Sequence, residues 1–125
     1  MIRPGVRERF LRDPLPIRLG GLAADLARIS SFSDDDRHSN AVLGLLEESK
    51  FFIEWTGPAA PPEVGAELAS IQVQLALWQV RWDRLWPDPQ ARQAMADQAA
   101  LWSRRILDMS GLLRGGRSLQ TPPPR

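Results

Sequence analysis

Few side chains in this sequence could carry out catalysis, and most of the usual catalytic groups are missing. The chain has 125 residues, no cysteine and a single histidine, His38. Nucleophilic catalysis needs a base positioned beside a serine, threonine or cysteine, and His38 is the only imidazole that could serve. Because His38 follows an aspartate run, a surface pair with Asp34 or Asp35 is the favoured interpretation. We therefore predict no catalytic residue and no enzymatic activity.

Two groups of carboxylates could in principle hold a metal ion. The run at 34–36 lacks the alternating ligands, glycine turn and distal glutamate of a calcium loop, so helix capping is the favoured interpretation. Glu47, Glu48 and Glu54 lack the Glu-x-x-His motifs of di-metal bundles, and Glu47 is expected to pair with Lys50. No phosphate-binding loop, dinucleotide motif or zinc spacing occurs. We predict neither a metal nor a cofactor.

Arginines interleave with tryptophans spaced four residues apart near the middle of the chain. Such a surface could stack bases or bind an anionic ligand, but the spacing favours Trp78 and Trp82 in the core with the arginines pointing outward. Trp86, at the end of its helix, is expected to point outward. Tryptophan and arginine are enriched in protein–protein hot spots. The candidate interaction surface comprises Trp78, Arg81, Trp82, Arg84, Trp86 and Trp102.

Four helices, at 15–32, 36–56, 62–86 and 89–113, are predicted to position these residues. The third helix carries apolar residues at alternating steps of four and three, typical of one buried seam: Val64, Leu68, Ile71, Leu75, Trp78, Trp82 and Leu85. Short connections between the helices predict an up-down antiparallel four-helix bundle. The last two helices are expected to be the longer pair, with 78–86 as a candidate projecting end.

The segments outside this four-helix domain of 14–113 are basic. Residues 1–12 and 114–125 each carry a net charge of +3, whereas 13–113 carry −5. We expect 1–13 to form an arm anchored by Phe10 and Leu11, and 114–125 to form a disordered tail. Within the first helix, Gly20 and Gly21 indicate close approach of another helix backbone, with a bend or a break as alternatives.

Three stretches resemble small helical proteins of cyanobacteria, a group to which no activity is attached. They are LRDPLPIRLGGLAADLARISSF at 11–32, FFIEWTGP at 51–58 and LALWQVRW at 75–82. The resemblance implies a bacterial, intracellular setting and carries over no site residue. The absence of cysteine and of any long apolar run separately predicts a cytoplasmic protein without a membrane span.

These observations predict a non-enzymatic module for protein–protein interaction or assembly. Self-association as a homodimer through the third and fourth helices is the first hypothesis, with another protein as the alternative partner. A second hypothesis is a small apolar or aromatic ligand bound between the tryptophans and Phe51, Phe52 and Trp55. A third is nucleic-acid binding through the arginine-rich ends, which we rank below the other two because the body of the chain is acidic.

Overall fold

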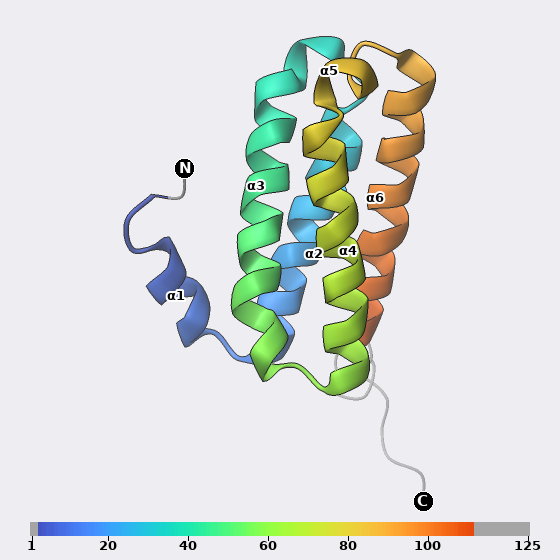
Figure 1. The fold of residues 1–125 in the computed structure, drawn as a ribbon. Helices are drawn as coiled ribbons and strands as arrows, with labels where there is room; N and C mark the ends of the chain where they lie inside the picture. The colour runs from blue at the N-terminus through green and yellow to red at the C-terminus, as the bar shows by residue number, and fades with distance from the viewer. Residues whose placement is uncertain (1–2, 112–125) are drawn as a thin grey trace, which may run out of the picture.

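The protein is an all-α helical bundle in the computed structural model, which describes residues 3–111. Its helices are α1 (Val6–Arg12), α2 (Leu15–Phe32), α3 (Ser39–Thr56), α4 (Pro62–Val80), α5 (Trp82–Leu85) and α6 (Pro89–Ser110), with 3-10 turns at Asp36–His38 and Gly57–Ala59. The long helices α2, α3, α4 and α6 lie side by side (Figure 1). The prediction of an all-α fold is confirmed for these residues.

The core forms where the apolar faces of the long helices meet. α2 packs against both α3 and α6, and α3 packs against α4. The predicted seam of the third helix is buried, since Leu68, Ile71 and Leu75 are almost inaccessible to solvent. The other fully buried side chains come from the other three long helices and include Leu26, Ile29, Leu46, Met95 and Ile106. Burial of these faces is the main favourable contribution to folding.

Prolines and glycines set the helix boundaries largely as predicted. Pro14 precedes α2, and prolines also open α4 and α6, where the missing N–H has no intrahelical partner. Gly57 follows α3, and the 3-10 turn that begins there contains Pro58. α6 ends before Gly111, whose φ of 78° is left-handed and favours glycine. The end predicted at 113 lies outside the described residues.

The predicted helix at 62–86 is interrupted at one residue. α4 ends at Val80, Arg81 has φ −95° and ψ 11°, and α5 begins at Trp82. α4 therefore has 19 residues against 18 each in α2 and α3, and only α6, with 22, is clearly longer. The prediction of a projecting end at 78–86 is wrong, because α5 folds onto the end of the bundle through contacts described below.

The predicted N-terminal arm contains a helix. α1 follows Gly5, whose φ of 86° is left-handed, and lies outside the four long helices beside α3 (Figure 1). Isolated helices this short are unstable in water, so tertiary contacts must hold α1 in place. Phe10 is buried and stacks on Phe52 at 4.2 Å between ring centroids. Leu11, the other expected anchor, accepts a hydrogen bond from Arg18 through its carbonyl oxygen. The predicted tail at 114–125 lies outside the described residues.

The glycine pair does not break α2, and the group that approaches Gly21 is not a helix backbone. α2 is continuous from Leu15 to Phe32. A Cβ placed on Gly21 would meet the Phe10 ring of α1 at 3.9 Å, an ordinary van der Waals contact. The neighbour at Gly21 is thus an aromatic side chain, which sequence periodicity could not identify. None of the helices in the described part of the chain is long and apolar enough to cross a membrane.

Candidate functional site

The tryptophans of the predicted interaction surface are buried. Trp78, Trp82, Trp86 and Trp102 expose 7%, 8%, 6% and 8% of their surface. Trp78 lies 5.1 Å from Trp102 between ring centroids, which joins α4 to α6 within the core. The four indoles therefore do not form an exposed patch on the single chain.

The prediction that Trp86 points outward is wrong, because its polar atom has a partner inside the fold. The indole N–H of Trp86 donates to the carbonyl oxygen of Asp36 at 2.8 Å, and that of Trp82 donates to Ser39 Oγ at 2.9 Å. The two rings stack at 4.9 Å. Buried tryptophans usually find such a partner for the N–H. The change of backbone direction at Arg81 lets both rings cover the connection between α2 and α3.

Arg92 closes this end of the bundle from α6. Its guanidinium donates to the carbonyl oxygens of Ser33 at 3.1 Å and Trp86 at 2.7 Å. The same group lies 5.4 Å from the centre of the Trp86 ring, within the range of a cation–π interaction. Arg92 thus links α6 to the first connection and to the residue after α5, and its role is structural.

The two arginines of the predicted surface are exposed, as their offsets from the seam suggested. Neither Arg81 nor Arg84 makes a side-chain hydrogen bond or ion pair within residues 3–111. Both line a groove of about 340 Å³ together with Gln74, Trp78, Leu85 and Ala91. The charged part of the predicted surface is therefore available to a partner or ligand.

The outer face of α4 is apolar as well as its core face. No charged residue occurs between Glu67 and Arg81. Val73 and Val80 expose 62% and 83% of their surface, the two most exposed large apolar side chains in the described range. We call the following residues the outer face of α4: Ala66, Ala69, Ser70, Val73, Ala76, Leu77 and Val80. The uncharged stretch from 68 to 80 was the signal for this face in the sequence.

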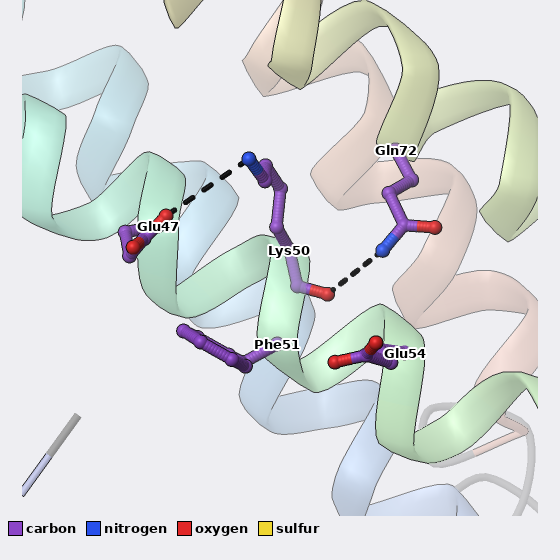
Figure 2. Close-up of a pocket in the computed structure, with 5 residues that line it drawn as sticks. All are labelled: Glu47, Lys50, Phe51, Glu54 and Gln72. Carbon is purple, nitrogen blue, oxygen red and sulfur yellow. Dashed lines mark hydrogen bonds and ion pairs between the residues drawn. The ribbon is translucent and has the colours of Figure 1, made fainter. Parts of the chain in front are cut away.

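The predicted pair of Glu47 and Lys50 is confirmed and belongs to a polar cluster between α3 and α4 (Figure 2). Lys50 Nζ lies 3.9 Å from Glu47 Oε1 and donates to Gln79 Oε1 at 2.6 Å. Gln72 donates to the carbonyl oxygen of Lys50 at 3.1 Å. Glu54 lines the same hollow without closing a metal site (Figure 2). The cluster ties two helices together.

The two aromatic groups expected to enclose a ligand lie far apart along α3. Trp82 bonds to Ser39, the first residue of α3, whereas Phe52 lies near the last turn of that helix. Thirteen residues of helix separate these positions, or about 20 Å at 1.5 Å per residue. Phe52 and Trp55 instead contact Phe10 of α1. The hypothesis of a small ligand between these two groups stays a prediction.

Sequence reasoning missed a buried carboxyl group on α2. Asp25 exposes only 2% of its surface, and the Glu48 side chain of α3 lies near enough to act on its pKa. Burial, and then Glu48, raise the pKa of Asp25 to about 8, although Arg28 at 3.0 Å acts in the opposite direction. No donor among the described residues reaches Asp25 Oδ2. A proton on the carboxyl group of Asp25 or Glu48 would therefore give this oxygen atom the bonding that it otherwise lacks. Asp25 lies three residues after Leu22 on an apolar face, which was the available signal.

The aspartate run caps a turn. Asp35 accepts the backbone N–H of Arg37 at 2.9 Å and bonds its guanidinium, which holds the pKa of Asp35 well below its usual range. His38 Nδ1 lies 3.0 Å from the carbonyl oxygen of Phe32. The capped element is the 3-10 turn at Asp36–His38, so α3 starts three residues later than predicted.

The described residues contain no group of three or more histidine, cysteine or acidic side chains that could hold a metal ion. The arginines that begin the chain are exposed at Arg7, Arg9 and Arg12, and the nucleic-acid hypothesis stays a prediction. The exposed arginines beside the α4 outer face thus remain the candidate site. Comparison of the chain with protein-family models, curated proteins and solved structures yields no match.

Proposed function

We propose that this protein is a non-enzymatic assembly module that forms a homodimer through the outer face of α4. The observation that carries the proposal is the exposure of Val73 and Val80, at 62% and 83%, within a helix that is apolar on both sides. Gln72, Gln74 and Gln79 lie between the core face and the outer face of α4, and a contiguous exposed apolar face of this kind typically marks an interaction surface. In the single chain, no other helix among the described residues covers the outer face of α4.

A second copy of the chain fits this face because the residue pattern is symmetric about Val73. Ala66 and Val80 lie seven residues on either side of Val73, and Ala69 and Leu77 lie four residues on either side. When two such helices pair in opposite directions, each of these residues meets its counterpart. That is the requirement for a two-fold interface, in which both copies use the same surface. The small side chains allow the two helices to approach closely.

The charges at the two ends of this face favour the antiparallel arrangement. Glu63 precedes the face, and Arg81 and Arg84 follow it, with Asp83 between the arginines. Antiparallel pairing centred on Val73 places the acidic start of α4 in one copy beside the end of α4 in the other copy, where Arg81 follows Val80. Parallel pairing would place arginine beside arginine and glutamate beside glutamate, which disfavours association.

The scaffold behind this face is, in our proposal, an up-down antiparallel four-helix bundle. The short connections at 33–38 and 57–61 support this order of helices. The face from 66 to 80 is about 22 Å long at 1.5 Å per residue. A single helix pair of that length buries less than a standard interface of roughly 1,600 Å². We therefore expect a dimer that dissociates in the micromolar range.

The proposal predicts that Val73→Glu abolishes dimerisation. The wild-type chain of 14.0 kDa is expected to shift from monomer to dimer over the micromolar range in sedimentation equilibrium. Val73→Glu would place two carboxylates opposite each other at the centre of the pair and weaken association by at least tenfold, or about 1.4 kcal/mol. Because Val73 is exposed in the single chain, the substitution is expected to leave helicity and thermal unfolding of the monomer unchanged.

The matched control replaces an exposed apolar residue on a different helix. Leu101 of α6 exposes 44% of its surface, and Leu101→Glu is expected to dimerise as the wild type does. A wild-type chain that stays monomeric at millimolar concentration would contradict the proposal. Equal loss of dimer in both variants would show that the α4 face is not the interface.

A further inference from the structure

We infer that the groove beside Trp78 is a binding site for a small aromatic or aliphatic organic anion, with Arg81 and Arg84 as the groups that recognise its charge. The groove has a volume of about 340 Å³, within the size range of small-molecule sites. It is separate from the outer face of α4, because none of the outer-face residues lines it. The inference does not rest on dimerisation.

The lining of the groove combines an apolar floor with unpaired cationic groups. Trp78, Leu85 and Ala91 supply apolar surface, and Gln74 supplies an amide. Neither guanidinium has a hydrogen-bond or ion-pair partner within residues 3–111. No acidic side chain is among the described residues that line the groove; Asp83 lines a neighbouring hollow, together with Val80 and the same two arginines.

The arginines in this groove differ from the other arginines that approach the core. Arg92 donates to two carbonyl oxygens, Arg28 pairs with Asp25, and Arg18 donates to the carbonyl oxygen of Asp13. Bonds within the fold therefore hold each of these three arginine side chains in position. Arg81 and Arg84 flank an apolar groove without such partners, and a carboxylate or phosphate is the chemical group that matches a guanidinium.

Trp78, which lines the groove, also carries an indole N–H donor. The indole N–H groups of Trp82 and Trp86 bond to Ser39 Oγ at the start of α3 and to the Asp36 carbonyl oxygen in the first connection. The N–H of Trp78 has no acceptor among residues 3–111, although the residue is 7% exposed. A tryptophan with so little exposure usually bonds through its N–H. An anion in the groove would be next to two cationic side chains and a residue with an unused donor.

The inference is tested with 2-naphthoate as the probe and its neutral counterpart 2-naphthylmethanol as the comparison. We expect saturable binding of the anion in calorimetry and a change in the Trp78 indole N–H signal in NMR spectra. Arg81→Gln and Arg84→Gln are each expected to weaken binding about tenfold, because each removes one charge-assisted hydrogen bond. The neutral comparison compound should bind at least tenfold more weakly than 2-naphthoate.

Two control variants separate this inference from general charge effects and from dimerisation. Arg104 is an exposed arginine of α6 outside the groove, and Arg104→Gln is expected to bind 2-naphthoate as the wild type does. Val73→Glu, which is expected to be monomeric, should also retain binding. Absence of saturation, equal binding of the neutral compound, or equal weakening by Arg104→Gln would each overturn the inference. Loss of dimer in Val73→Glu with binding retained would support both proposals separately.

Discussion

Replacement of Trp86 by alanine is expected to lower the free energy of unfolding by about 3–5 kcal/mol, the cost typical of deleting a buried aromatic side chain. The substitution removes the stacking on Trp82, the hydrogen bond to the Asp36 carbonyl oxygen and the surface beneath Arg92. Domains of this size have a total stability of roughly 5–15 kcal/mol, so the variant would be markedly less stable. Urea unfolding followed by far-ultraviolet circular dichroism measures the change.

Two further variants define the role of Trp86. Trp86→Phe keeps a ring but loses the N–H donor, and we expect a cost of about 1–2 kcal/mol from the unpaired Asp36 carbonyl and the smaller ring. Arg104→Ala changes an exposed side chain of α6 outside the proposed dimer face and should lie within about 0.5 kcal/mol of the wild type. If Trp86→Ala left stability unchanged and abolished the dimer, Trp86 would be an interface residue and the packing described above would be wrong.

The second large effect concerns Asp25 and has a defined dependence on pH. The pKa of Asp25 is about 8 in the folded chain against an ordinary value of 3.8, so the folded state binds more protons between these two values. Its stabilising contribution is therefore complete below pH 3.8 and is lost as the pH rises towards about 8. Asp25→Asn removes this titration, because the amide stays neutral. At about pH 9 we expect the variant to be more stable than the wild type by about 1–3 kcal/mol.

Thermal unfolding between about pH 5 and pH 9 tests this prediction. The wild type should lose stability from about pH 5 to about pH 8 and level off above that, and Asp25→Asn should show a flatter profile, although it also loses the charge pair with Arg28. Asp97 of α6 is an exposed carboxylate, and Asp97→Asn should keep the wild-type profile. A wild-type profile in Asp25→Asn would mean that Asp25 is ionised in the folded chain at neutral pH.

Much of the fold was predictable because the determining signals are local. Proline and glycine positions set most of the helix boundaries, and the heptad steps of the third helix identified its buried seam. α1 was missed because its seven residues have no period of their own and depend on Phe10 docking against Phe52. The break at Arg81 was missed for a related reason. Nothing in residues 78–86 indicates that the indole N–H groups of Trp82 and Trp86 bond to Ser39 and Asp36.

Sequence periodicity predicted that the charged residues of the candidate surface are exposed, but it did not predict that Trp86 is buried. Arg81 and Arg84 are exposed because they lie off the seam, which periodicity alone could establish. Trp86 is buried because its indole bonds to the backbone oxygen of Asp36, 50 residues earlier in the chain. The spacing of neighbouring residues cannot predict a contact at that separation. Asp25 shows the same limit. Its neighbour Glu48 lies on another helix, so the pattern of α2 gave no reason to connect the two carboxyl groups.

The bonds that hold the first connection have a consequence for the order in which the molecule can form during synthesis. Ser33, Asp36 and Ser39 take their partners from Arg92, Trp86 and Trp82, which are 59, 50 and 43 residues further along the chain. During synthesis, α2 and α3 therefore leave the ribosomal exit tunnel first. The side chains that fix the turn between them, Trp82, Trp86 and Arg92, emerge well after. Contacts at such separations form late, because the intervening chain must be ordered first. This end of the bundle is thus completed only when the start of α6 arrives, and until then the nascent chain exposes the α2 surface that α6 will cover.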